Sequence, residues 1–271
     1  MSAVLLGPDG VAEYHDGTDM AAQLSPRPYL LARTRAGVVV TDRHTSDHAH
    51  HYGVSAALPD VNGTSFWGGR TYVREAGSQL LDNHGVQRLD ERKATADGVA
   101  ERVTWLDRTG ESLLTERRVL RIGAFERGWA LNWRSVLEAE SEVTFGSPQT
   151  NGRDGAFYGG LFWRTPFRRA RAVCADGAGD ERAHGSSSPW LALVSDHATL
   201  IARTPPGFPW FVRTEGYVGF GPAVAAAQRR VLHPGSALAL ELRIAVLDGT
   251  LADADLAAAA ERLRAWEVEE G

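Results

Sequence analysis

The sequence predicts an all-β protein, a large antiparallel β-sandwich that ends in one C-terminal helix. Short apolar segments of strand character recur about every ten residues, separated by turns rich in glycine, proline and aspartate. Helical periodicity is confined to the end of the chain. Two packed sheets would bury the apolar faces of such strands, and the loops at the sheet ends would be free to build a site.

The strands are predicted as a series of hairpins. The first two segments flank the turn GPDG, and residues 29–42 repeat this pattern around Ala36-Gly37. The clearest hairpin is residues 98–123, where Val103 and Trp105 alternate with polar neighbours and Arg108-Thr109-Gly110 form the turn. Further strands are predicted in residues 128–146, in a hairpin at 189–204, and in 237–249.

A helix is predicted at about residues 253–267, with Asp253 or Asp255 as its N-cap. Apolar side chains at steps of three and four would dock it on the sandwich. This stripe consists of Leu256, Ala259, Leu263 and Trp266.

Size and composition favour one domain over residues 1–271. The chain has 271 residues, of which 43% are apolar and 23% charged, as in a globular protein with a substantial core. Residues 176–189, DGAGDERAHGSSSP, are the best candidate for a domain boundary. Strands of similar character lie on both sides, so we interpret this segment as a surface loop.

Charge and cysteine content exclude several classes of protein. The net charge is −5 and the arginines are scattered, which argues against a nucleic-acid partner. Cys174 is the single cysteine, so neither an internal disulfide nor a cysteine-based zinc site is expected. The N-terminal residues do not resemble a signal peptide, and no apolar run is long enough to span a membrane. We therefore expect a soluble, cytoplasmic protein without a membrane partner.

The segment DHAHHYG, residues 47–53, holds three of the chain's nine histidines. If it is extended, His48 and His50 point to one side and His51 to the other. Two imidazoles so placed can bind one divalent transition metal, and Asp47 could orient a ring from behind. The alternatives are catalytic or substrate-binding use without a metal, and a polar loop whose histidines bond to backbone or water.

Residues 60–73 follow with DVNGTSFWGGRTYV. The two glycines permit a close approach of the backbone to a ligand, or a bulge. Trp67 offers a flat face of the kind that stacks on a sugar ring, and Arg70 a fork of donors for hydroxyls or a carboxylate. Asp60 and Asn62 would complete the polar lining. The alternative is a β-bulge with a core tryptophan and a surface arginine.

His84 lies between Asn83 and Gly85. A His-Gly pair at a turn often exposes the ring, so we expect His84 to act as a third ligand or as a general base.

A glycine-rich polar stretch at residues 146–164, GSPQTNGRDGAFYGGLFWR, is predicted to form a pocket wall. It is not a phosphate-binding loop, because no Gly-Lys-Ser/Thr follows. The members expected at the wall are Asn151, Arg153, Tyr158 and Trp163.

In residues 205–222, PPGFPWFVRTEGYVGFGP, polar and aromatic residues are spaced so that they share one face of a strand. They are Trp210, Arg213, Glu215 and Tyr217. Glu215 is the candidate general acid or base, and the alternative is a surface salt bridge. Serine and cysteine nucleophile motifs are absent from the sequence.

Residues 27–74, with TNGRDGAFYGGLFWR at 150–164 and PWFVRTEGYVGFGP at 209–222, resemble an uncharacterised bacterial family often labelled "PmoA family" or methane oxygenase. The resemblance covers nearly the whole chain. Members of that family commonly occur among actinobacterial sugar-catabolism genes, which implies carbohydrate metabolism. A membrane methane oxygenase needs spanning helices, and this sequence has none, so oxygenase activity is not expected.

The strand order is also similar to the large sandwich of the aldose-epimerase (galactose mutarotase-like) superfamily, whose enzymes use a histidine and a glutamate on a sugar. Residues 150–160 fall where that superfamily has its catalytic-histidine loop, but Asn151 stands there instead. Glu215 comes late enough in the chain to resemble the glutamate. The missing histidine argues against simple mutarotation unless one from elsewhere fills the role; the candidates are His48, His51 and His84.

The prediction is an enzyme that acts on a sugar or oxidised-sugar derivative by epimerisation, elimination or glycoside cleavage, in a histidine-rich pocket at one end of the sandwich. The expected catalytic residues are His48, His51, His84 and Glu215. The expected substrate-binding residues are Asn62, Trp67, Arg70, Asn151, Arg153, Tyr158 and Arg213. The alternative is a non-catalytic carbohydrate-binding or sensor protein that uses the same pocket.

Overall fold

The long central strands alternate buried and exposed side chains, as a sheet with one face in the core requires. In β9 (Gly98–Leu106), Val99, Val103 and Trp105 are buried. β10 (Ser112–Phe125) pairs antiparallel with β9 on one edge and with β11 (Gly128–Glu138) on the other. The structure, a computed structural model, describes residues 3–266.

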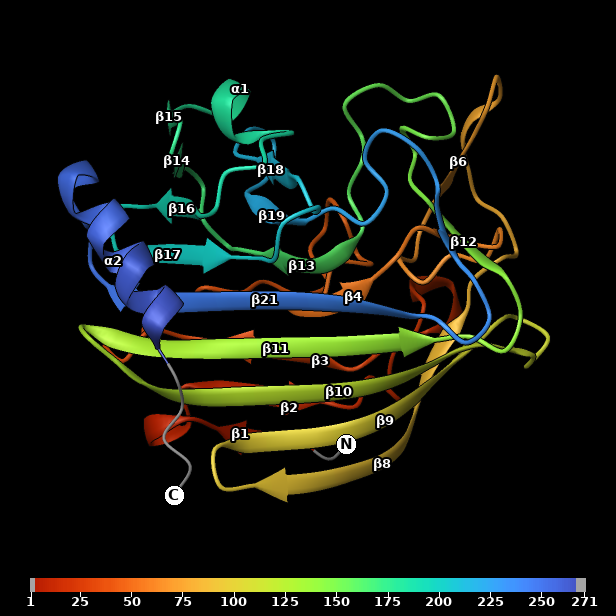
Figure 1. Ribbon diagram of the computed structural model, residues 1–271, viewed down its shortest axis with the longest axis horizontal. Helices are drawn as coiled ribbons and strands as arrows, with labels where there is room; N and C mark the ends of the chain where they lie inside the picture. The colour runs from red at the N-terminus through yellow and green to blue at the C-terminus, as the bar shows by residue number, and fades with distance from the viewer. Residues whose placement is uncertain (1–2, 267–271) are drawn as a thin grey trace.

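Two large antiparallel sheets face each other across the main core (Figure 1). The nine-stranded sheet has the order β15 (Gly177–Ala178), β14 (Arg171–Cys174), β16 (Leu191–Val194), β17 (Ala198–Arg203), β21 (Ala237–Asp248), β11, β10, β9 and β8 (Val86–Thr95). The seven-stranded sheet has the order β1 (Val4–Leu6), β2 (Ala12–His15), β3 (Tyr29–Ala32), β4 (Val54–Ala57), β13 (Gly160–Arg164), β19 (Gly219–Pro222) and β18 (Trp210–Arg213).

Smaller elements surround these sheets. A three-stranded sheet contains β20 (Arg230–Leu232), β12 (Val143–Gly146) and β5 (Asp60–Val61), and a hairpin contains β6 (Thr71–Val73) and β7 (Gly77–Gln79). The helices are η1 (Pro8–Gly10), η2 (Ala22–Leu24), α1 (Asp180–Ala183) and α2 (Asp253–Ala265). None of the helices described in residues 3–266 is long and apolar enough to cross a membrane.

The predicted antiparallel sandwich with a C-terminal helix is confirmed, and so are the hairpins at residues 98–123 and 189–204. In the hairpin predicted at residues 29–42, the strand after Ala36-Gly37 is shorter than predicted. It pairs with the first strand through an isolated bridge between Arg33 and Val39. The segment at residues 176–189 contains β15 and α1.

The start of α2 differs from the prediction. Its N-cap is Ala252, which makes no side-chain capping hydrogen bond. Asp253 and Asp255 lie in the first turn, where their negative charge interacts favourably with the positive end of the helix dipole. Leu256, Ala259 and Leu263 are buried against the nine-stranded sheet as predicted. Trp266 follows the helix and packs at the edge of this cluster. Residue 267, the predicted end, lies outside the described residues.

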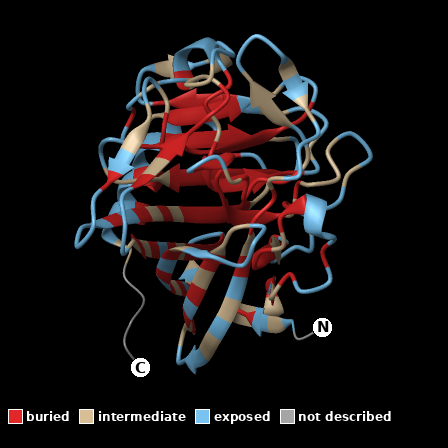
Figure 2. Ribbon diagram, turned by 90° about the vertical axis from the view of Figure 1, so that its right-hand side faces the viewer, coloured by how far each residue is buried: buried red, intermediate tan, exposed pale blue. Residues whose placement is uncertain are grey.

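The strands beneath the site are buried on both faces. All residues of β4 and β13 are buried. Figure 2 shows that buried residues, in red, fill the strands in the middle of the molecule. Leu161 and Trp163 face the core between the sheets, whereas Phe162 joins a second aromatic cluster on the outer face of the seven-stranded sheet. Alternate side chains of β13 therefore pack in two different places, the main core on one face of the sheet and the aromatic cluster on the other.

A buried charge network joins the two large sheets. Arg118, on the inner face of β10, donates to the Glu116 carboxylate at 2.7 and 2.8 Å and to the Tyr14 hydroxyl at 2.9 Å. Tyr14, on β2, in turn donates to Glu101 on β9 at 2.7 Å, and Arg92 closes the chain against Glu101 at 2.6 Å. Two carboxylates thus face two guanidinium groups inside the sandwich, where an unpaired charge would be costly.

We expect Arg118→Met to lower the free energy of unfolding by about 3–5 kcal/mol, because it leaves Glu116 charged and uncompensated in the core. Arg117→Met is the matched control, since this exposed neighbour pairs with Glu138 at the surface and should cost less than about 1 kcal/mol. Urea denaturation of both variants measures the difference. Equal losses of unfolding free energy in the two variants would contradict the interpretation that the buried charge network stabilises the contact between the two large sheets.

Candidate functional site

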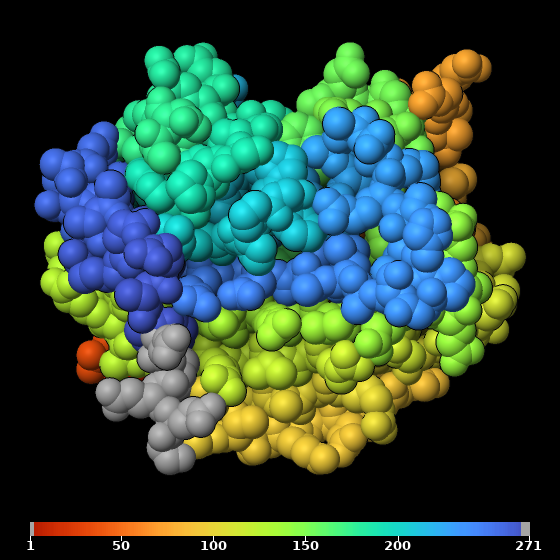
Figure 3. Space-filling model, in the orientation of Figure 1, coloured from red at the N-terminus to blue at the C-terminus, as the bar shows by residue number. Residues whose placement is uncertain are grey.

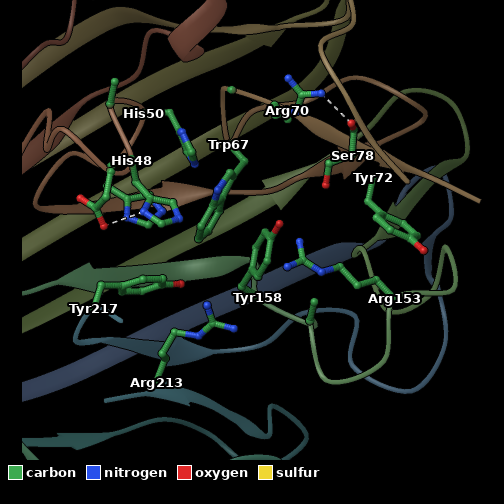
Figure 4. A pocket seen from close by; sticks show the side chains of 15 residues that line it. His48, His50, Trp67, Arg70, Tyr72, Ser78, Arg153, Tyr158, Arg213 and Tyr217 are labelled. Atoms are coloured by element: carbon green, nitrogen blue, oxygen red, sulfur yellow. Dashed lines mark hydrogen bonds and ion pairs between the residues drawn. The ribbon is translucent and has the colours of Figure 1, made fainter. Parts of the chain in front are cut away.

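A pocket of about 330 Å³ lies over the outer face of the seven-stranded sheet (Figure 4). Four segments line it: the histidine turn, the loop from Trp67 into the β6–β7 hairpin, the glycine-rich loop before β13, and the chain from Arg213 to Tyr217. The prediction that the pocket lies at one end of the sandwich was wrong, because the pocket lies over the outer face of a sheet. The aromatic cluster around Phe162 covers the outer sheet face, so loops can build a site on top of it.

The histidine segment forms tight turns and is not extended, contrary to the prediction. The backbone N–H of His48 donates to the Thr45 carbonyl at 3.2 Å, and that of His51 to the His48 carbonyl at 2.9 Å. The His48 and His51 rings therefore stack, with centroids 4.7 Å apart and planes at 15°. His50 meets both rings edge-on, at 5.6 and 4.7 Å. All three imidazoles line the pocket.

Asp47 orients His48 as expected from the sequence. The Asp47 carboxylate lies 2.7 Å from His48 Nδ1 and also accepts from Arg164 Nη2 at 3.2 Å. Burial alone would raise the pKa of Asp47, but hydrogen bonds from Thr45 and His48 and the charge of Arg164 hold it well below its ordinary range. Because Asp47 is ionised, Nδ1 of His48 carries the proton, which leaves Nε2 as the basic nitrogen.

His50 and His51 are held in the neutral form. Burial, aided by the positive charge of Arg27, lowers the pKa of His50 to about 3. Burial also lowers the pKa of His51 well below its ordinary value, and the neighbouring imidazoles add to this effect. The Nδ1 atom of His51 is buried and has no hydrogen-bond partner within residues 3–266. These rings can donate or accept hydrogen bonds without carrying charge.

The loop beside the histidines depends on two glycines. Gly68 and Gly69 have φ of +90° and +72°. A Cβ on Gly68 would lie 2.4 Å from the Leu24 carbonyl oxygen, and one on Gly69 would lie 2.6 Å from His50 Nδ1. The glycines therefore allow the chain to pass directly over His50, which places Arg70 at the pocket mouth.

Aromatic side chains form the floor and one wall. Trp67 is 4% exposed, and Tyr158 and Phe162 pack against it with centroids at 4.5 and 4.8 Å. Its faces are thus largely covered, and the half-buried rings of Tyr72 and Tyr158 present more aromatic surface. Burial raises the pKa of Tyr158 to about 12, so its hydroxyl is a hydrogen-bond donor at neutral pH.

His84 and Asn62 lie outside the pocket lining. The prediction that the His84 ring is exposed was wrong, since it is 9% exposed and its Nε2 lies 2.7 Å from the Gly69 carbonyl oxygen. His84 supports the glycine loop from behind. Asn62 accepts from the Thr144 backbone N–H at 2.8 Å and so joins the β5 turn to β12.

Asn151 lies beside the pocket in a narrow cleft next to Tyr158. Its side-chain amide donates to Asp60 at 3.2 Å, and Arg229 binds the same carboxylate through two donors at 2.6 and 3.0 Å. This cluster fixes the glycine-rich loop against β5. Trp163 lies in the main core, where its indole N–H donates to the Val40 carbonyl.

Glu215 does not share a face with Arg213 and Tyr217, because β18 ends at Arg213 and Glu215 lies in the turn that follows. Glu215 is exposed and lines a second, open hollow together with Asp180 and His184. Figure 3 shows this surface notched between the teal segment that contains α1 and the green segment between β12 and β13.

Sequence reasoning missed Tyr72 and Ser78, which line the pocket, and Arg164, which holds Asp47. Arg164 is 6% exposed, and its guanidinium lies 4.5 Å above the Tyr217 ring. Its position in β13, two residues after Phe162, places it on the outer face. The sequence could have indicated this position, because residues two apart on a predicted strand point to the same face of the sheet.

A metal on His48 and His50 stays a prediction. In the part of the chain that the structure describes, no group of three or more His, Cys, Asp or Glu side chains could hold a metal ion. Cys174 is buried in the main core, away from the pocket lining.

Comparison with known proteins gives a family model and a distant structural likeness. The model described as "Family of unknown function (DUF6807)" matches residues 2–261. No curated protein matches the chain. Among solved structures, a galactose mutarotase related enzyme from Lactobacillus acidophilus is similar with a TM-score of 0.39 and 9% identity, covering 93% of this chain and 100% of that chain. A likeness at this level carries no argument about function, and the PmoA label stays a prediction.

The neutral histidines predict a pH-dependent stability. The unfolded chain binds a proton at His50 below about pH 6.5, whereas the folded chain does not until about pH 3, so stability is lost as pH falls through this range. We expect His50→Gln to reduce this loss by up to about 1.4 kcal/mol per pH unit. Urea denaturation between pH 8 and 5 measures it, with each protein's own value at pH 8 as its reference. Parallel curves for the two proteins would show that His50 is not held neutral.

Proposed function

The chain belongs to the DUF6807 family, and we propose that it is a proton-transferring enzyme acting on a sugar or an oxidised-sugar derivative. The observation that carries this proposal is the 2.7 Å contact between Asp47 and His48 at the wall of a 330 Å³ pocket. A carboxylate that fixes the tautomer of an imidazole is the arrangement of a general base.

The pair has the parts needed for one proton transfer. Asp47 accepts from His48 Nδ1–H, so Nε2 is the atom that removes a proton from the ligand. The imidazolium formed in this step is stabilised by the Asp47 charge. Arg164 is a positioning residue, because it donates to both oxygens of the Asp47 carboxylate and helps to keep it ionised.

The pocket suits a ligand of monosaccharide size. Its volume is at the lower end of the range for small-molecule sites. Aromatic surface from Tyr72 and Tyr158 lies beside hydrogen-bonding groups from Arg70 and Ser78, and a sugar presents the same alternation of C–H faces and hydroxyls. Arg70 is held in place by its hydrogen bond to the Ser78 carbonyl at 2.8 Å.

Epimerisation or elimination fits this lining better than glycoside cleavage. Cleavage usually takes two carboxylates on either side of the bond, and Asp47 is the single carboxylate among the described lining residues. In the favoured reactions a C–H bond beside a carbonyl breaks, the proton moves to His48 Nε2, and the electron pair moves into the carbonyl as an enolate. A neutral ring such as His51 can donate a hydrogen bond to that oxygen. Reprotonation of the opposite face by solvent gives an epimer. Alternatively, the His48 imidazolium returns its proton to a β-hydroxyl, which leaves as water and gives an elimination product.

The test is exchange of carbon-bound hydrogen in D₂O, followed by NMR over a panel of keto-sugars, uronates and aldoses. We expect His48→Gln to slow exchange by about 10²–10⁴-fold, because it removes the general base. Asp47→Asn should slow it less, since the imidazole remains but loses its orienting partner. His233→Gln is the control, because that histidine is exposed and lies outside the pocket.

Exchange that survives His48→Gln at the wild-type rate would overturn the assignment of His48. Sugar binding without exchange of any carbon-bound hydrogen would favour the alternative of a non-catalytic carbohydrate-binding or sensor protein.

A further inference from the structure

The pocket contains more positive charge than its own residues neutralise. Arg70, Arg153 and Arg213 line it, and the one lining carboxylate, Asp47, already pairs with Arg164. The chain as a whole has a net charge of −5. A local excess of arginine in an acidic protein attracts anions to this one place.

Arg153 and Arg213 form no ion pair or side-chain hydrogen bond with any residue in the range 3–266. Elsewhere the arginines near loops are commonly paired, as Arg229 is with Asp60 at 2.6 Å and Arg171 with Asp253 at 2.6 Å. The Arg213 guanidinium lies 5.1 Å above the Tyr217 ring. Both forks therefore retain free N–H donors.

The two guanidinium groups converge on one part of the pocket. Figure 4 shows Arg153 and Arg213 reaching toward Tyr158 from two different segments. The charges of both arginines oppose the rise that burial causes in the pKa of Tyr158 and in that of Tyr217. Both positive charges thus act on the same two tyrosines, and an anion bound between them would offset their mutual repulsion.

The backbone holds both arginines in position. Arg213 is the last residue of β18, on the same outer face as Phe211. Arg153 lies in a loop closed by hydrogen bonds from its own N–H to the Pro148 carbonyl at 2.8 Å and from Ala156 N–H to its carbonyl at 3.2 Å. Gln149 anchors this loop to the Ala226 carbonyl at 2.8 Å.

We propose that the ligand of this pocket carries an anionic group, a carboxylate or a phosphate, which Arg153 and Arg213 bind together on the side of the pocket next to Tyr158. The inference rests on the proposed function only in taking this pocket as the ligand site. Planar guanidinium forks suit both anions, because each can accept two parallel hydrogen bonds. With the anion fixed there, the remainder of a monosaccharide lies between Tyr158 and the histidine turn.

Matched sugars test the proposal by isothermal titration calorimetry: glucose, glucuronate and glucose 6-phosphate, and galactose with galacturonate. We expect at least one anionic sugar to bind about tenfold or more tightly than its neutral partner, with the advantage falling as salt is raised. Tighter binding of the uronates identifies a carboxylate, and tighter binding of the phosphate ester identifies a phosphate.

Arg153→Gln and Arg213→Gln should each lower the ratio of anionic-sugar affinity to neutral-sugar affinity, measured on the same variant, by about tenfold. Arg134→Gln is the matched control, an exposed arginine on β11 outside the pocket lining. Equal binding of anionic and neutral sugars, absence of binding by the whole panel, or an equal effect of Arg134→Gln would overturn the proposal.

The outcomes separate this inference from the proposed enzyme. If anionic sugars bind through Arg153 and Arg213 but exchange no carbon-bound hydrogen, the anion site stands and the enzymatic proposal fails. If neutral sugars bind equally well and exchange hydrogen through His48, the enzymatic proposal stands and the anion site fails.

Discussion

The pocket depends on one buried cation, Arg27. This side chain is 2% exposed, and its guanidinium donates to the carbonyls of Leu24 and Ser25 at 2.8 and 2.9 Å, to the His50 carbonyl at 2.7 Å and to the Ser55 hydroxyl at 3.0 Å. It thus joins η2, the histidine turn and β4. Burial lowers the pKa of Arg27 to about 10, so it stays charged at neutral pH. Without it, buried carbonyls would lose their donors.

The same cation helps to give three neighbouring histidines different chemistry. The turn that Arg27 fixes through the His50 carbonyl buries His50 and His51, and its charge adds to the burial that keeps them neutral. The His48 ring differs from the other two in its hydrogen bond to Asp47, whose carboxylate Arg164 also contacts. One proton carrier and two uncharged hydrogen-bonding rings therefore arise within four positions of sequence. The backbone turn, more than the spacing of the histidines, creates this division.

Much of this arrangement follows from sequence patterns, and the remainder depends on long-range packing. Alternation of Val103 and Trp105 predicted β9 correctly, because one face of that strand is in the core. Glu215 lies elsewhere because β18 ends two residues before it, and strand ends carry only a weak signal in sequence. His84 is buried by its contact with the Gly69 carbonyl, which local sequence does not reveal. Arg27 lies more than twenty residues from the turn that it holds, and nothing in its neighbourhood predicts burial.

The fold assigns one proton-transfer role to His48 and keeps His50 and His51 neutral. Long-range ¹H–¹⁵N correlation of the imidazole nitrogens, recorded between pH 8 and pH 5 and assigned with single His→Gln variants, tests it without any ligand. We expect His48 as the Nδ1–H tautomer at pH 8, and His50 and His51 with the nitrogen shifts of neutral rings throughout. Protonation of His50 or His51 near pH 6.5, or His48 as the Nε2–H tautomer, would contradict it.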